Sequence, residues 1–284
     1  MDAKAKRSWK QRLRSWLIAL VVIYAAWAIV VYAIQTRLLF PTYMIAARPP
    51  FVPPAGGGVE VVGVTGPEGV IETIVMRPTN GRAAEPGPVV IVFHGNAELA
   101  RDGVGSRLEE HLRSRGITVV APEYRGYGTM AGSPGQKEIG DDMVAVADWV
   151  AKQPWCDQQR VVYFGWSVGG GVACQLATAR EPSGGMILQS TFTSVASFAG
   201  GFAVPVLLVK HPFRNDRVLE SLDAPVLIVH GVNDSIVPVE HGRSLARIAR
   251  HGEYVELAGD HFHDWADWGA YLGAIDRWLT ARGM

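Results

Sequence analysis

The sequence predicts a mostly parallel α/β sheet with helices on both faces, preceded by one membrane-spanning helix. Three observations point to this class. Short β-branched runs alternate with helix-like stretches after residue 58, several of these runs are almost wholly apolar, and a long apolar segment lies near the N-terminus. Alternating strands and helices favour a parallel sheet, and strands that are buried on both faces are apolar throughout.

The composition excludes several classes of protein. Of 284 residues, 48% are hydrophobic and 19% are charged, so the chain is not intrinsically disordered. Lys and Arg number 27, and so do Asp and Glu, so there is no basic excess for binding nucleic acid. Two cysteines, Cys156 and Cys174, are too few for a disulfide scaffold and match no zinc motif.

The apolar segment near the N-terminus has the length of a membrane span. No charged residue occurs between Arg14 and Arg37, and the nineteen residues 16–34 would form a helix about 28 Å long. A buried core helix and a cleaved signal peptide are the alternatives. The apolar core of a signal peptide is usually shorter, and the small-residue cleavage site at 25–28 falls inside this run. We therefore expect residues 1–36 to form a basic tail and a retained anchor.

Charge on the two sides of the span predicts its orientation. Six basic residues and one acid, Asp2, precede the apolar run, and on the far side Arg37 is the first charge. Basic flanks stay in the cytoplasm, so we expect a single-pass protein with its main domain outside the cytoplasm. The six basic residues are Lys4, Lys6, Arg7, Lys10, Arg12 and Arg14.

After the anchor we expect a Pro/Gly-rich collar over residues 37–58 and a single domain over residues 59–284. The expected strands are 59–64, 71–77, 89–93, 117–121, 161–165, 186–189, 225–230 and 254–257. The expected helices are 105–115, 139–151, 168–180, 240–250 and 265–281.

A candidate nucleophile lies between an expected strand and an expected helix. Residues 165–169 read Gly-Trp-Ser-Val-Gly, the G-x-S-x-G pattern of a sharp strand-to-helix turn that lifts a serine out of the sheet. Side chains two residues before and after the serine would clash, which explains Gly165 and Gly169. A glycine-rich turn that happens to contain a serine is the alternative, and the strand and helix around Ser167 argue against it.

Two backbone N–H groups are expected to stabilise an oxyanion beside Ser167. One belongs to Val168, at the start of the helix that follows the serine. The other is expected from the loop after strand 89–93, where Gly95 permits a tight turn and Asn96 can point its N–H at a substrate. We expect His94 in the same loop to be structural.

A serine nucleophile needs a base and an acid that orients the base. Asp234 follows the apolar strand 225–230, at the edge of the sheet where catalytic groups gather. A turn-forming aspartate is the alternative for Asp234. Asp216 and Asp223 are weaker candidates, because neither follows a buried strand.

The base is expected in the loop after the last strand, which contains His261 and His263. His261 directly follows the Gly-Asp turn and is favoured, whereas His263 precedes Asp264, which we expect to cap the final helix. A metal site formed by residues 260, 261, 263 and 264 is disfavoured, because alternating neighbours on one loop rarely converge on one ion.

These motifs occur in the order typical of alpha/beta hydrolases. The chain resembles the single-span, membrane-anchored subgroup of that superfamily, relatives of which include protein depalmitoylases. The resemblance is carried by 94–96 (His-Gly-Asn), 124–128 (Tyr-Arg-Gly-Tyr-Gly), 165–169, 230–234 (His-Gly-Val-Asn-Asp) with Pro238, and the His261 loop. It covers residue 37 to the C-terminus, and the anchor also fits.

The resemblance implies a role for each candidate: Ser167 as nucleophile, Asp234 as orienting acid, His261 as base, and the amides of Asn96 and Val168 as oxyanion donors. The stretch 261–264, His-Phe-His-Asp, departs from relatives that carry one histidine followed by Asn-Asp. On this ground His263 stays a candidate beside His261.

Residues 190–222 lie between two expected strands, where such hydrolases insert a lid. The segment is rich in phenylalanine, valine and leucine. It fits either a pair of short core helices or a short lid that lines an acyl pocket.

The sequence therefore predicts a serine hydrolase that cleaves carboxylic esters or acyl thioesters through an acyl-enzyme, with no metal or organic cofactor. A serine peptidase with the same machinery is one alternative. A catalytically silent membrane-tethered binding protein is another, which the full Ser, Asp and His set disfavours. The expected partners are an acyl substrate and the lipid bilayer through residues 16–34. The substrate is expected to be a small or lipid-like molecule, with an acylated protein as the alternative.

Overall fold

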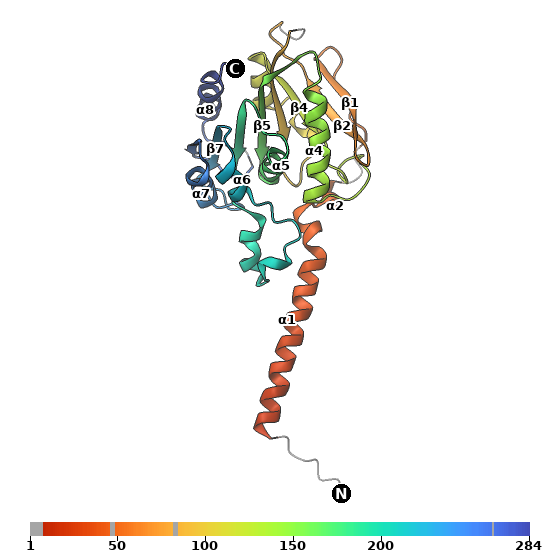
Figure 1. The fold of residues 1–284 in the computed structure, drawn as a ribbon, viewed down its shortest axis with the longest axis vertical. Coiled ribbons are helices and arrows are strands. Elements are labelled where there is room, and N and C mark those ends of the chain that lie inside the picture. Colours follow the sequence, from red (N-terminus) through yellow and green to blue (C-terminus); the bar gives the residue numbers. More distant parts are fainter. Residues whose placement is uncertain (1–7, 46–48, 82–84, 263) are drawn as a thin grey trace.

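A computed structural model describes residues 8–45, 49–81, 85–262 and 264–284. A long helix, α1 (Trp9–Leu39), projects from a domain built on one eight-stranded sheet (Figure 1). The strands are β1 (Val59–Gly66), β2 (Gly69–Met76), β3 (Gly87–Phe93), β4 (Thr118–Pro122), β5 (Cys156–Trp166), β6 (Gly185–Gln189), β7 (Val226–Gly231) and β8 (Gly252–Leu257).

The sheet has the order β1-β2-β4-β3-β5-β6-β7-β8. Only β2 runs against its neighbours, β1 and β4, and the strands from β4 to β8 are parallel. The expectation of a mostly parallel sheet is confirmed. Because β3, β5, β7 and β8 are parallel, the loops that follow them meet at one edge of the sheet.

Both faces of the sheet are covered by helices. Along β3 the side chains alternate, so that Val89 and Ile91 pack with Val172 of α5 (Val168–Ala177), while Val90 packs on the other face with Ile275 of α8 (Trp268–Thr280). The first face also carries α4 (Gln136–Val150) and α7 (Glu240–Ile248), and the second carries α3 (Arg107–Ser114). Burial on both faces explains the continuous apolar runs in the sequence.

The start of the last helix differs from the expectation. Asp267, not Asp264, caps α8, and its side chain accepts a hydrogen bond from Ala270 N at 3.0 Å. The helix begins at Trp268, three residues later than expected, because Trp265 packs into the core instead of forming the first turn. The Trp265 ring is buried and stacks on Tyr271 with 4.9 Å between the ring centroids.

The segment that follows α1 is more than a linker. α1 continues to Leu39 and ends there because Pro41 has no N–H to donate. A short helix, α2 (Thr42–Ile45), comes next, and both Phe40 and Ile45 are buried in the core. The Phe40 ring packs edge-on against Phe213, 6.3 Å between centroids. The collar expected over residues 37–58 therefore begins as part of the folded domain.

The insertion between β6 and β7 contains both a core helix and a lid-like part, the two structures expected for it. Its last part, α6 (Asn215–Ser221), packs into the core through Leu219. Its first part forms two 3-10 turns, η2 (Val195–Phe202) and η3 (Val206–Leu208), which project from the domain beside α1 (Figure 1). We refer to residues 195–209 as the lid.

Candidate active site

Ser167 stands on a strained turn between β5 and α5. Its backbone has φ 54° and ψ −118°, a conformation that costs energy for a residue with a side chain. A Cβ on Gly169 would clash with the carbonyl of Phe93, and one on Gly165 would clash with the carbonyl of Gly169. Side chains at these two positions would therefore clash, as expected from the sequence. The absence of a Cβ at Gly169 lets the turn lie directly against the end of β3.

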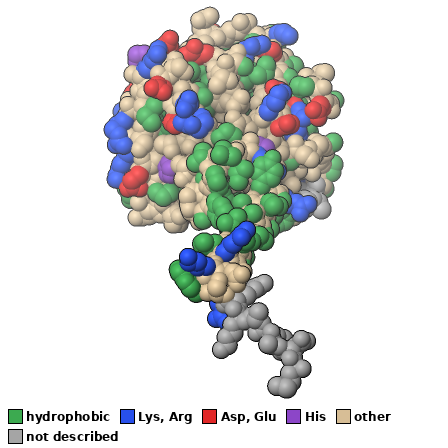
Figure 2. Space-filling model, turned by 60° about the horizontal axis from the view of Figure 1, so that its bottom comes forward, with side chains coloured by type: hydrophobic (Ala, Val, Ile, Leu, Met, Phe, Trp, Pro, Cys, Tyr) green, Lys and Arg blue, Asp and Glu red, His purple; other side chains and the backbone are tan. Residues whose placement is uncertain are grey.

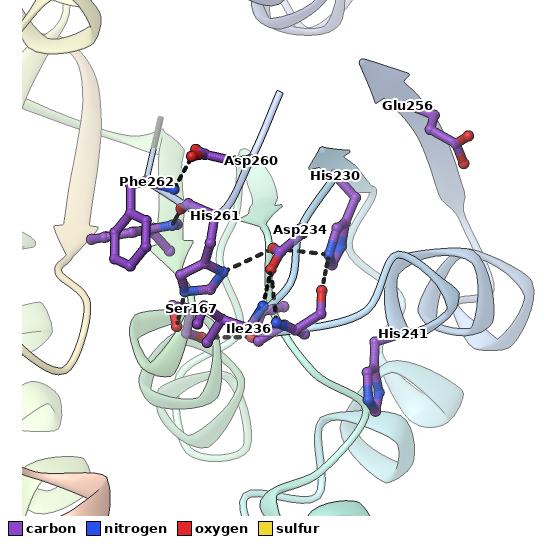
Figure 3. A network of polar contacts seen from close by, with 12 residues as sticks. Ser167, His230, Asp234, Ile236, His241, Glu256, Asp260, His261 and Phe262 are labelled. Atoms are coloured by element: carbon purple, nitrogen blue, oxygen red, sulfur yellow. Dashed lines mark hydrogen bonds and ion pairs between the residues drawn. The ribbon is translucent and has the colours of Figure 1, made fainter. Parts of the chain in front are cut away.

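Ser167, His261 and Asp234 form a hydrogen-bonded chain (Figure 3). His261 Nε2 lies 3.0 Å from Ser167 Oγ, and His261 Nδ1 lies 2.8 Å from Asp234 Oδ2. All three residues are buried. With the Nδ1 proton donated to the carboxylate, Nε2 is free to accept the serine proton. His263, the other candidate base, lies outside the described residues.

Both carboxylate oxygens of Asp234 accept hydrogen bonds. Its Oδ1 accepts hydrogen bonds from Ile236 N at 2.9 Å and Val237 N at 2.7 Å, and its Oδ2 also lies 3.3 Å from His230 Nε2. Burial alone would raise the pKa of Asp234, but the hydrogen bonds from His230, His261 and Val237 outweigh it and hold the pKa well below its ordinary value. The carboxylate is therefore charged at neutral pH.

The loops of Asp234 and His261 are joined to each other. Val232 N donates to Leu257 O at 2.9 Å and Asn233 N donates to Gly259 O at 3.0 Å. The backbone of His261 is also held by β5, because Trp166 Nε1 donates to the carbonyl of His261 at 3.1 Å. These contacts preset the spacing between the acid and the base before any substrate binds.

The loop after β3 is braced by His94 and by Glu123, a residue whose role was not predicted from the sequence. His94 donates from Nε2 to Glu123 Oε1 at 2.9 Å and from Nδ1 to Gly95 O at 2.8 Å. Burial lowers the pKa of His94, but the Glu123 carboxylate and the Gly95 carbonyl together raise it above its ordinary value. Both ring nitrogens of His94 are therefore engaged within the structure, in the structural arrangement expected for it.

Asn96 is held in the same loop, because Tyr127 Oη donates to its carbonyl at 2.8 Å. Asn96 and Val168 line one cavity together with Ser167. Gly95 has no room for a side chain, since a Cβ would lie 2.6 Å from the Trp166 ring. The two expected oxyanion donors thus lie on the same side of the serine.

The cavity above Ser167 has a volume of about 340 Å³ and apolar walls, within the usual range of about 300–1,000 Å³ for ligand pockets. Part of its wall comes from the lid, through Phe198 and Leu208, and part from α1, through Ala28 and Val31. No pattern in the sequence predicts that α1 reaches the site. Among the described residues no group of three or more metal-binding side chains is found.

Comparison with known proteins identifies the family and the fold. The profile of the prolyl oligopeptidase family matches residues 106–261. An uncharacterized protein of Mycobacterium tuberculosis H37Rv is 35% identical over 202 residues, 68% of this chain and 70% of that protein. The lysophosphatidylserine lipase ABHD12 of Rattus norvegicus is 29% identical over 57% of this chain and 45% of its own length, so the match spans less than half of that lipase.

Solved structures share the fold. A serine hydrolase without a lid from Xanthomonas campestris superimposes with a TM-score of 0.60 and 23% identity, covering 82% of this chain and 97% of its own.

The low pKa of Asp234 predicts an acid-sensitive contribution to stability. A carboxyl group whose pKa is lower in the folded than in the unfolded chain stabilises the fold above its unfolded pKa of about 4, and this stabilisation is lost as the pH falls further. We expect Asp234→Asn to lower the melting temperature at pH 7, and to lose less stability than the wild type between about pH 5 and pH 2. Tryptophan fluorescence during heating in detergent measures both.

Asp223→Asn is the control, because the exposed Asp223 carboxylate contacts Arg250 at the surface. It should follow the wild-type pH dependence. An Asp234→Asn curve parallel to the wild type down to pH 2 would contradict the assignment of a low pKa.

Proposed function

Because this chain belongs to the prolyl oligopeptidase family of the alpha/beta-hydrolase superfamily, we propose that Ser167, His261 and Asp234 are the catalytic residues of a serine hydrolase. The relative that is a lysophosphatidylserine lipase supports an acyl ester or thioester of a lipid-like molecule as its substrate. The observation that carries the proposal is the continuous hydrogen-bonded chain from Asp234 to Ser167, at 2.8 and 3.0 Å, which opens on an apolar cavity.

In the proposed mechanism Ser167 Oγ attacks the acyl carbon while His261 Nε2 takes the serine proton. The carbonyl oxygen becomes negatively charged and is stabilised by the backbone N–H groups of Asn96 and Val168. His261 then gives its proton to the leaving alkoxide or thiolate. In the second half of the reaction His261 takes a proton from water, and the water attacks the acyl-enzyme. His261 then returns the proton to Ser167 Oγ, and the carboxylic acid product is released.

The walls of the cavity support an acyl substrate. None of the described residues that line it carries a charge, so the site offers no partner for an ionic side chain or a phosphate beside the serine. The match to the prolyl oligopeptidase family keeps a peptidase as the second candidate, because the same three groups cleave amides.

Ser167→Ala should abolish both fluorophosphonate labelling and ester hydrolysis, by at least about a thousandfold in kcat/KM, because loss of a nucleophile removes the covalent route. Full-length wild type and variant are compared on p-nitrophenyl esters, acyl thioesters and a peptide amide panel. Matched melting temperatures exclude unfolding as the cause.

Ser235→Ala is a suitable control, since Ser235 is exposed beside the site. It should label and turn over like the wild type. Retention of more than a tenth of the activity in Ser167→Ala would contradict the proposal, and preferential cleavage of peptides would favour the peptidase.

We also propose that α1 crosses the membrane once, with the N-terminus in the cytoplasm and the domain of residues 59–284 outside it. Over the described residues α1 is long and apolar enough to span a bilayer. The basic residues before the apolar run support this orientation by the positive-inside rule. The relevant membrane partner would then be the lipid bilayer around residues 16–34, and an acylated membrane protein is a further possible substrate.

A protease added to intact spheroplasts should digest the hydrolase domain and spare an epitope tag at the N-terminus. The physical reason is that moving several basic side chains across the membrane is more costly than moving the domain after them. Lysed spheroplasts are the control, in which both parts should be digested. A protected domain in intact spheroplasts would reverse the orientation.

A further inference from the structure

We propose that the membrane helix α1 is part of the substrate site: together with the lid it encloses the acyl chain of a membrane lipid whose ester lies at Ser167. This inference rests on the proposed function and adds the chemical class and the route of the substrate. It makes α1 a wall of the binding site as well as an anchor.

One face of α1 is turned towards the cavity. Ala28, Val31 and Gln35 follow one another at helical spacing, and all three line the cavity. Val31 is the one residue in the middle of α1 that is buried, whereas its neighbours Ala26, Val30 and Ala33 are exposed. At its inner end the same cavity is lined by Ser167, Asn96 and Val168. The helix face and the nucleophile therefore share one continuous space.

Polar contacts hold α1 against the lid at a fixed position. Trp27 Nε1 donates to the carbonyl of Phe202 at 2.8 Å. Gln35 makes two contacts, donating to Leu208 O at 2.9 Å and accepting from Lys210 N at 2.7 Å. A flexible tether would make no such paired contacts. The hydrogen bonds also satisfy lid backbone groups that would be costly to leave unpaired in a membrane.

The contacts between α1 and the lid place the lid at the level of the membrane interface. The contact at Trp27 lies about 10 Å along α1 from the end of the apolar span at Ile34, a depth typical of helices that lie in the membrane interface. The Lys210 ammonium lies 4.1 Å from the Tyr32 ring centroid, as expected near the polar boundary.

The outer surface of the lid is apolar and uncovered. Val206 is 59% exposed and Leu207 is 85% exposed. Figure 2 shows hydrophobic side chains gathered on the domain around the point where α1 leaves it. Such a patch is costly in water, and it is continuous with the lipid-facing side of α1. The bilayer that surrounds α1 is the partner that covers it.

The cavity fits one acyl chain rather than a whole lipid. Its volume of about 340 Å³ is at the lower end for ligand pockets, and none of the described residues that line it is charged, so its walls hold no partner for a phosphate headgroup. The chain would enter from the hydrocarbon region between α1 and the lid, with the ester at Ser167 and the headgroup outside the cavity.

Two alanines in α1 provide a matched test. Ala28 lines the cavity, and Ala26 is exposed about 200° around the helix at nearly the same depth. In Ala28→Trp the indole occupies the part of the cavity in which we place the acyl chain of the substrate. We expect the ratio of p-nitrophenyl palmitate to p-nitrophenyl butyrate hydrolysis to fall at least about tenfold. In Ala26→Trp this ratio should stay within about twofold of the wild type.

Full-length proteins in lipid nanodiscs are compared, and each rate is divided by the amount of protein that reacts with a fluorophosphonate. Phe198→Ala, which enlarges the lid side of the cavity, should instead move the preferred chain length upwards. An unchanged ratio in both Ala28→Trp and Phe198→Ala, or an equal fall in Ala28→Trp and Ala26→Trp, would overturn the inference. Failure of the proposed function is distinguishable, because Ser167→Ala would then retain hydrolysis of both esters.

Discussion

The close approach of two backbone segments, the turn at Ser167 and the end of β3, is the constraint on which the rest of the site depends. Gly165 and Gly169 permit the approach because neither position has room for a Cβ. The approach forces Ser167 into a strained conformation, which is tolerated because the neighbouring strands and helices are buried on both faces. It also brings the start of α5 next to the loop of Asn96, so that Asn96 and Val168 line one cavity with the serine.

A second constraint positions the acid and the base. Hydrogen bonds between the loops after β7 and β8 join Asp234 to His261 before a substrate arrives. His230 supports Asp234 from behind, since its Nε2 lies 2.8 Å from Val237 O and 3.3 Å from the carboxylate. Preorganisation of this kind avoids reorganisation cost during the reaction. Helix α1 contributes in the same way, because its contacts with the lid fix the shape of the cavity.

Much of this arrangement follows from local sequence patterns. The strand and helix alternation, the apolar strands and the glycines around Ser167 predicted the sheet and the turn, because burial and backbone sterics act over short stretches of chain. The residues Asp234 and His261 could be chosen because they follow strands whose ends meet at one edge of the sheet.

Contacts between distant segments could not be predicted in this way. Glu123 beside His94 and Gln35 of α1 against the lid depend on pairings that only the folded chain creates. The Asp264 cap was predicted wrongly, because burial of Trp265 moved the start of α8 by three residues. The collar was read as a linker because Pro and Gly dominate it, although Phe40 and Ile45 are buried in the core.

The central claim is that a nucleophilic Ser167 lies at the inner end of a cavity walled by the membrane helix. It is tested most directly with an alkyl fluorophosphonate that carries a photoreactive diazirine at the end of its chain. The probe reacts with the full-length protein in nanodiscs, is irradiated, and its attachment points are mapped by mass spectrometry of peptides. The account predicts that Ser167 Oγ displaces fluoride and becomes phosphonylated, with crosslinks to α1 between residues 28 and 39 or to the lid. Phosphonylation of another residue, or crosslinks confined to the α3 and α8 face of the domain, would contradict it.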